Sequence, residues 1–255
     1  MKYLLSLFIS FIMAVSAYAD CAGTGLSVFP QGPNIRQNSI FIIDGYAESQ
    51  HVILDLNTRH AVYLKSGNKK VKLLVTEICV GEFFLTQALL KPETELEAGL
   101  QYTLCIDGLP EYENLNRYNS KTDHYEPLTY QVVTGKDTEK PHVMSKPKEL
   151  GKSLVHYGCG PSIYVVFDNP AKDGSELIVR TTVKNIKTGK ETTYYLQPDQ
   201  SKLKVGHGMC AGAFTFDEGE HYEVEFSFMD ASGNITAWTG ERIRFTKPVK
   251  ETDND

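Results

Sequence analysis

The sequence lacks the short motifs that mark several common enzyme classes. It has no Gly-x-Ser-x-Gly elbow, no His-Glu-x-x-His segment and no glycine-rich phosphate loop ahead of a helix. It holds five cysteines, but none forms a Cys-x-x-Cys pair, and no two histidines have zinc-site spacing. We therefore expect a protein that is not an enzyme and needs no cofactor.

Positive charge is also scarce. Lys and Arg number 26 against 32 Asp and Glu, which gives a net charge of −6, and the basic residues form no stripe. Binding to nucleic acid requires clustered Lys and Arg against the phosphates. The composition therefore argues against a nucleic-acid partner.

Only one long apolar run occurs, from Leu4 to Val15. It is short for a membrane span, it follows Lys2, and "AYA" at 17–19 has the form of a signal-peptidase site. A membrane anchor is the alternative, and a lipoprotein is disfavoured because Asp20 directly precedes Cys21. We expect a signal peptide at 1–19, no membrane span after its removal, and a secreted, periplasmic or cell-surface protein.

Helical periodicity is missing from the rest of the chain, whereas strand signals are frequent. Short segments rich in β-branched and aromatic residues alternate with glycine-bearing turns such as "KSGNKK", "KTGKE" and "DASGN". In the first half these segments are "SIFIIDGY", "HVILDL", "AVYL", "VKLLVTEI", "FFLTQALL", "QYTLCI" and "LTYQVV". In the second half they are "SIYVVF", "ELIVRTTV", "TTYYL", "KLKV", "AFTF", "YEVEFSFM" and "RIRF". The pattern predicts an all-β protein.

A polar stretch with two prolines, Pro141 and Pro147, separates the two halves. Proline donates no backbone hydrogen bond and fits poorly in a central strand. We predict two consecutive antiparallel β-sandwich domains, at 20–137 and 148–248, joined by a linker at 138–147 and followed by a disordered tail at 249–255.

One local pattern occurs twice, in "LEAGLQY" and in "FDEGEHY". Each has an apolar residue, a Gly three positions later and a Tyr three positions after that: Leu96, Gly99 and Tyr102, then Phe216, Gly219 and Tyr222. An alternating segment follows each Tyr. This is the arrangement of a tyrosine corner, in which a buried Tyr bonds the backbone where a strand enters an immunoglobulin-type sandwich. Alternation predicts that Leu104 and Ile106 face the core and that Cys105 faces away.

These stretches carry a resemblance to a known group of modules. With "YQVVTGKDTEKP", "DASGNITAW" and "RIRFTKP", the chain resembles tandem bacterial Ig-like or fibronectin type III-like modules. The resemblance is best in the second half. The buried Trp and inter-sheet Cys pair of antibody domains are missing from matching places. The resemblance implies the fold and no particular function, because such modules serve as spacers, adhesion units and accessory domains.

Two glycine-rich segments, "HYGCGPS" and "GHGMCAG", each contain one cysteine. In an exported chain we predict a disulfide between Cys159 and Cys210, and one further pair among Cys21, Cys79 and Cys105 that the sequence does not choose. The predicted Cys159–Cys210 bond would bring His156, His207 and Met209 together. Imidazole and thioether ligands suit copper, which makes a periplasmic copper-binding protein an alternative function.

The segment from Pro110 to Pro127 is long for a connection between neighbouring strands. It contains Tyr112, Tyr118, His124 and Tyr125. We predict that the segment is either a binding loop or a disordered insertion. "DASGN" (230–234) reads as a tight turn in preference to a calcium loop, because a calcium site needs more oxygen ligands than this turn offers.

Taken together, these features predict an exported, non-catalytic binding or structural protein. Its partner would be an unidentified protein or carbohydrate. The alternatives are the copper-binding protein and an enzyme whose site the sequence does not reveal.

Overall fold

The computed structural model describes residues 21–249. The predicted signal peptide at 1–19 and all but the first residue of the predicted tail at 249–255 lie outside this range. No helix in the described range is both long and apolar enough to cross a membrane. The all-β prediction is confirmed, because the described chain consists of strands and connections with a single short α-helix.

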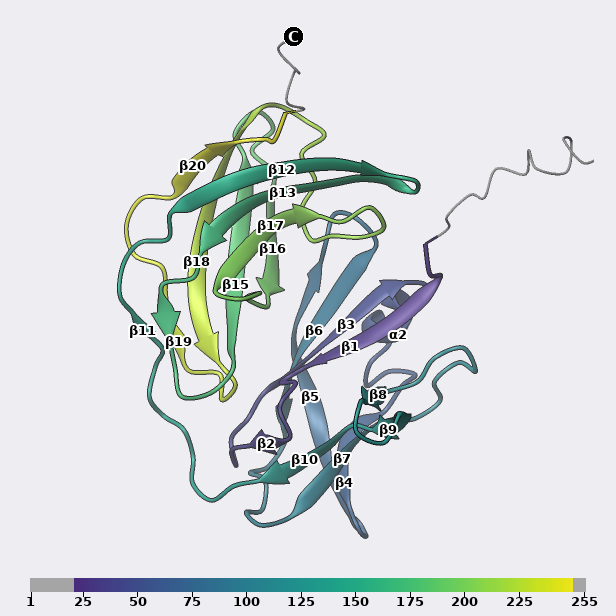
Figure 1. The fold of residues 1–255 in the computed structure, drawn as a ribbon. Helices are drawn as coiled ribbons and strands as arrows, with labels where there is room; N and C mark the ends of the chain where they lie inside the picture. The colour runs from purple at the N-terminus through teal and green to yellow at the C-terminus, as the bar shows by residue number, and fades with distance from the viewer. Residues whose placement is uncertain (1–20, 250–255) are drawn as a thin grey trace, which may run out of the picture.

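The elements form two groups that follow one another along the chain (Figure 1). The first group comprises β1 (Thr24–Phe29), β2 (Asn34–Ile35), β3 (Phe41–Ala47), α2 (Gln50–Leu54), β4 (Val62–Ser66), β5 (Lys69–Val80), β6 (Leu85–Pro92), β7 (Gln101–Ile106), β8 (Asn116–Asn119), β9 (His124–Pro127) and β10 (Thr129–Val132). The second comprises β11 (His142–Val143), β12 (Glu149–Tyr157), β13 (Gly160–Asp168), β14 (Ala171–Lys172), β15 (Leu177–Asn185), β16 (Glu191–Leu196), β17 (Lys202–His207), β18 (His221–Asp230), β19 (Ile235–Thr236) and β20 (Ile243–Thr246).

In the first group, the long strand β5 belongs to two layers. Its first residues, Lys69 to Lys72, pair with β4, and the rest, from Leu73 on, pair with β6, with a register shift between Val75 and Glu77. The sheet order β1-β3-β6-β5-β4-β7-β10-β2 therefore folds back on itself at β5. Phe41 and Leu90 from one layer share a buried cluster with Leu64 and Tyr130 from the other, which is the core of a sandwich.

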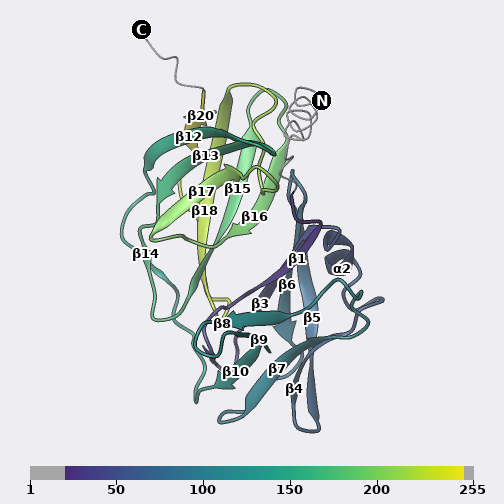
Figure 2. The same cartoon turned by 45° about the vertical axis from the view of Figure 1, so that its right-hand side comes forward.

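In the second group, two separate sheets enclose the core. One has the order β12-β13-β17; the other has the order β16-β15-β18-β19, with β20 also paired to β18. Phe167 of the first sheet packs edge-on against Phe226 of the second, with ring centroids 5.2 Å apart. Figure 2 shows these strands stacked above the first group.

Both predicted tyrosine corners are present. Tyr102 and Tyr222 are buried, and the glycines three residues before them have φ angles of +82° and +81°. The Tyr222 hydroxyl donates to the Glu218 carbonyl at 2.6 Å, while the Tyr102 hydroxyl accepts the Glu97 N–H at 3.4 Å. Each Tyr therefore bonds the backbone a few residues upstream, as the motif predicts.

The two corners should respond differently to loss of the hydroxyl. Tyr222→Phe is expected to lower the free energy of unfolding by about 1 kcal/mol, because it removes one of the two short hydrogen bonds that the Glu218 carbonyl accepts, the other coming from the Asn185 amide. Tyr102→Phe should cost less, because its bond is long. Urea denaturation of the two variants measures both values, and a larger loss in Tyr102→Phe would contradict this ranking.

Alternation also orients the strand after the first corner as predicted. Leu104 and Ile106 are buried, and Cys105 between them is partly exposed.

The prediction of a strand at "HVILDL", by contrast, is wrong, because residues 50–54 form helix α2. A short apolar run fits either a strand or a helix, and here Ser49, buried beside Gly45, starts the helical turn.

The predicted linker at 138–147 contains a short strand. β11 pairs with β14 through His142 and Lys172 and through Val143 and Ala171. This stretch is therefore attached to the second group through backbone hydrogen bonds. The residue numbers of the domain boundary stay a prediction.

The two groups meet where β5 and β6 pack on the edge strand β16, a contact we call the junction. The Gln87 side chain donates to the Tyr195 carbonyl at 3.1 Å and accepts the Tyr195 N–H at 3.0 Å. It also donates to Asp44 at 2.9 Å, and the Tyr194 hydroxyl donates to the same carboxylate at 2.5 Å. The Gln87 side chain thus hydrogen-bonds the Tyr195 backbone groups that the edge strand β16 would otherwise leave unpaired.

Candidate functional site

The segment predicted as a binding loop or a disordered insertion forms a β-hairpin. Strands β8 and β9 pair with each other and with no other strand of the described chain. Tyr118 and Tyr125 stand directly opposite in the register, so both rings lie on one face of the hairpin. Their centroids are 5.5 Å apart with an interplanar angle of 60°, and the residues are 50% and 70% exposed.

The hairpin turn is held by side chains that accept or donate local hydrogen bonds. The Asn119 carbonyl accepts the Asp123 N–H at 2.9 Å, and Asp123 has a φ of +59°. Thr122 and the Asn119 amide both donate to Glu126, at 2.7 and 2.9 Å. The turn is therefore ordered before any partner binds, which lowers the entropy cost of binding.

Hydrogen bonds also shift the ionisation of this hairpin. The Tyr118 hydroxyl donates to Asp123 at 2.6 Å, which raises the pKa of Tyr118 because the bond favours the neutral phenol. The bonds from Asn119 and Thr122 lower the pKa of Glu126. At neutral pH the hairpin therefore presents the neutral Tyr118 ring and the ionised Glu126 carboxylate.

Two side chains fix this segment to the rest of the protein. The Arg117 guanidinium donates to the Gln31 carbonyl in the connection between β1 and β2. Glu113, which is buried, accepts a hydrogen bond from the Ser49 hydroxyl ahead of α2. The sequence prediction missed both anchors, since neither partner is close in the chain. Of the other predicted site residues, Tyr112 is 57% exposed and His124 is exposed at the start of β9.

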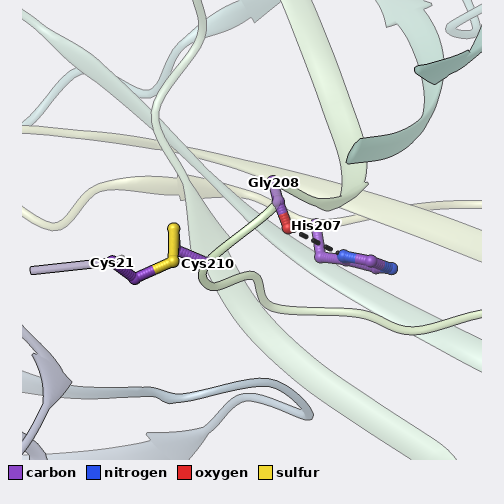
Figure 3. Close-up of a disulfide and its surroundings, with 4 residues drawn as sticks. All are labelled: Cys21, His207, Gly208 and Cys210. Atoms are coloured by element: carbon purple, nitrogen blue, oxygen red, sulfur yellow. Dashed lines mark hydrogen bonds between the residues drawn. A yellow bond between two sulfur atoms is a disulfide. The ribbon is translucent and has the colours of Figure 1, made fainter. Parts of the chain in front are cut away.

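The predicted Cys159–Cys210 disulfide is wrong. Cys210 is bonded to Cys21, across a sequence separation of 189 residues and with a Cα–Cα distance of 5.7 Å (Figure 3). The expectation of a pair among Cys21, Cys79 and Cys105 is also wrong, because Cys21 is bonded to Cys210 and neither Cys79 nor Cys105 forms a disulfide in the described chain. The residues just ahead of β1 approach the loop after β17, a proximity between the two groups that no local pattern encodes.

The other cysteines have different surroundings. Cys79 is buried, and burial raises the pKa of its thiol to about 12. Cys105 lies on β7, and burial also raises the pKa of its thiol. Cys159 lies near the disulfide, where its sulfur and those of Cys21 and Cys210 are all within 4.8 Å of one another.

The residues of the copper hypothesis lie on separated strands. His156 is exposed on β12 and His207 is buried on β17, with β13 between them in the sheet. One nitrogen of His207, Nδ1, lies 2.8 Å from the Gly208 carbonyl, as Figure 3 shows, and its ring packs edge-on against Phe83. Met209 is 38% exposed. Because the hypothesis relied on the Cys159–Cys210 bond to bring these side chains together, it has lost its geometric basis and stays an untested prediction.

The "DASGN" segment is a turn, as predicted, and two more carboxylates approach it. Asp230 is buried and accepts the N–H groups of Ser232 and Asn234 at 2.8 Å each. Carboxylate oxygens of Asp137 and Asp173 lie within 4.8 Å of Asp230 and of one another. Burial, and to a smaller degree the charge of Asp137, raises the pKa of Asp230 against the lowering effect of these hydrogen bonds. Three such oxygens are fewer than the six to eight that calcium takes.

Comparisons with known proteins assign no family. No protein-family model matches the sequence, and no curated protein matches it. Among solved structures, the chain is similar to a pullulanase from Anoxybacillus sp. LM18-11 complexed with maltotriose, at 9% identity and a TM-score of 0.25, over 84% of this chain and 24% of the pullulanase. This chain thus spans about a quarter of that pullulanase.

Two further solved structures are similar at the same level. One is a chain of a cytokine receptor complex, at 9% identity and a TM-score of 0.26, over 89% of this chain and 98% of that one. The other is the Yersinia pseudotuberculosis adhesin InvE, at 13% identity and a TM-score of 0.22, over 89% of this chain and 59% of the adhesin. Similarities this low do not assign a function to the chain.

Proposed function

We propose that this is an exported, non-catalytic binding or structural protein of the periplasm or cell surface, built from two Ig-like or fibronectin type III-like modules. The β8–β9 hairpin is its contact surface. The observation that carries this proposal is the Tyr118–Tyr125 pair, two large rings on one face of an ordered hairpin with half or more of each residue exposed. Exposed tyrosines supply large contact areas at a low cost in side-chain entropy.

The geometry of the pair favours a protein partner over a carbohydrate. The rings meet at an interplanar angle of 60°, so they form a ridge in place of the flat platform on which a sugar ring stacks. Both signs of charge lie in the same hairpin, from Lys121 and Asp123 in the turn and Glu126 on β9. An aromatic centre with a polar rim is typical of protein–protein interfaces.

Replacement of both rings should remove the interaction. The immobilised protein would be exposed to envelope extract, and the captured proteins would be quantified for the wild type and for Tyr118→Ala/Tyr125→Ala. Because truncating a buried aromatic anchor costs about 2 kcal/mol or more, we expect at least about a tenfold drop in the capture of the specific partner. The exposed positions of both rings leave the fold itself nearly unaffected.

Tyr157→Ala is a matched control, since Tyr157 is 55% exposed and lies on β12, outside the hairpin. It should keep full capture. Equal capture by all three proteins would reject the hairpin as the contact surface. Retardation of the wild type and of Tyr157→Ala, but not of the double variant, in gels containing a soluble polysaccharide, with no protein captured, would instead show a carbohydrate ligand.

A further inference from the structure

Three cysteine sulfurs meet at one place although they come from distant parts of the chain. Cys21 precedes β1, Cys159 lies between β12 and β13, and Cys210 lies in the loop after β17. All three sulfurs lie within 4.8 Å of one another, and all three residues are partly exposed. In Figure 1 the tip of the β12–β13 hairpin extends toward the purple start of the chain.

The backbone holds the second and third cysteines in place. The register of β12 and β13 pairs Tyr157 with Gly160, which puts Cys159 in a two-residue turn at the hairpin tip. A Cβ on Gly160 would lie 3.4 Å from the Met209 carbonyl, so the tip touches the loop that carries Cys210. That loop is fixed to the first group, because Gly212 and Phe83 exchange backbone hydrogen bonds of 2.8 and 3.1 Å.

We propose that these three cysteines form a thiol–disulfide exchange site in which Cys159 competes with Cys21 for Cys210. Cys159 loses its proton to solvent, and its thiolate attacks the Cys210 sulfur. A Cys159–Cys210 bond forms as the Cys21–Cys210 bond breaks, and Cys21 leaves as a thiolate that takes up a proton. One disulfide replaces another, so the step needs no external oxidant or reductant.

The other two cysteines, Cys79 and Cys105, do not take part in the exchange between Cys21, Cys159 and Cys210. Cys79 is buried, and with a pKa raised to about 12 it supplies almost no thiolate near neutral pH. Cys105 lies on β7, outside the group of neighbouring sulfurs. Partial exposure of the trio, by contrast, gives solvent access for the proton steps.

The exchange changes how the two groups of strands are connected. The Cys21–Cys210 bond joins the start of the first group to the second. The Cys159–Cys210 bond lies wholly within the second group and leaves Cys21, ahead of β1, without a covalent link to that group. The site is therefore a covalent connection between the groups that can open without a change in the overall redox state.

Disulfide mapping of the purified full-length protein tests this exchange. The protein would be held at a pH of about 8.5, near the ordinary cysteine pKa, without any added thiol, so that only exchange within the chain can occur. Acid would then stop the reaction, and pepsin digestion followed by mass spectrometry would identify the linked peptides. We expect a Cys159–Cys210 peptide beside the Cys21–Cys210 peptide, with alkylation of Cys21 in the same fraction of chains.

Two variants test the exchange further. Cys21→Ser, treated with oxidised glutathione as the oxidant, should form the Cys159–Cys210 bond, so that only two of its four cysteines react with an alkylating reagent in denaturant. Cys105→Ser should exchange as the wild type does. The wild-type map is decisive even if Cys21→Ser fails to fold: a map with Cys21–Cys210 alone, or with Cys21 linked to Cys159, would overturn the proposal.

Discussion

Reduction of the Cys21–Cys210 disulfide is expected to lower the free energy of unfolding by up to about 5 kcal/mol. The bond spans 189 residues, and the chain-entropy relation for disulfides gives about 5 kcal/mol at 25 °C for a loop of this length. This is a large part of the stability of an ordinary protein. Urea denaturation with and without a phosphine reductant, at one pH, measures the change.

The double variant Cys21→Ser/Cys210→Ser separates this effect from other actions of the reductant. It should unfold near the urea concentration at which the reduced wild type unfolds, and the reductant should not change it further. Cys105→Ser, which leaves the disulfide intact, should remain as sensitive as the wild type. Equal midpoints for the oxidised and reduced wild type would show that the bond contributes no net stability.

The features that the sequence predicted well depend on neighbours along the chain. The two corners at Tyr102 and Tyr222 follow from residues six positions apart or fewer, and both are buried as predicted. The strand after each corner follows from the alternation of apolar residues, which has the period of the backbone itself. Helix α2 was missed because an apolar run of a few residues has no period long enough to distinguish a helix from a strand.

The features that the sequence did not predict depend on contacts between the two groups of strands. The partner of Cys210 is set by where the chain start lies in space, and Cys159 was the nearer choice along the chain. Likewise, Asp137 joins Asp173 and Asp230, which both belong to the second group, because the end of the first group lies beside the second. The spacing of residues within one segment does not predict these contacts between the two groups.

The junction left one signal in the sequence that could have been used. Asp44 lies in "IIDGY" and Gln87 in "LTQALL", and each is a polar residue inside a run of buried strand residues. A strand that is buried on both faces is a nearly continuous apolar segment in the sequence. A polar residue inside such a segment needs a hydrogen-bond partner, here one from another sheet. The partners proved to be Tyr194 and Tyr195 of β16.

Asp44→Asn is expected to stabilise the protein at neutral pH and to have little effect in acid. Burial raises the pKa of Asp44 from 3.8 to about 6, against the lowering effect of the hydrogen bonds from Tyr194, Gln87 and Ser27. Below a pH of 3.8 the carboxyl is neutral in the native and unfolded states, so it costs nothing. As the pH rises, the unfolded state ionises first, and above a pH of about 6 the native state carries a buried charge.

The rise from 3.8 to about 6 corresponds to about 3 kcal/mol. Asparagine keeps an oxygen for the two hydrogen bonds that Oδ1 accepts, from Tyr194 and Gln87. Its amide can donate to the Ser27 hydroxyl, which is both a donor and an acceptor. The difference in unfolding free energy between variant and wild type, from urea titrations at pH about 4 and pH about 8, should therefore shift by about 2 kcal/mol in favour of the variant, because at pH about 4 the unfolded carboxyl is already partly ionised.

Glu82, which also joins the two groups, should give the opposite dependence on pH. Burial acts to raise its pKa, but hydrogen bonds from Thr192, Thr215 and Lys190 outweigh burial and lower the pKa below 4.5. Its ionised form therefore stabilises the native state above a pH of 4.5, and this contribution is lost as the pH falls through the lowered value. Glu82→Gln should be most destabilising at pH about 8 and least in acid. If the two variants showed the same direction of change with pH, the burial of Asp44 without a neighbouring cation would not be the cause of its raised pKa.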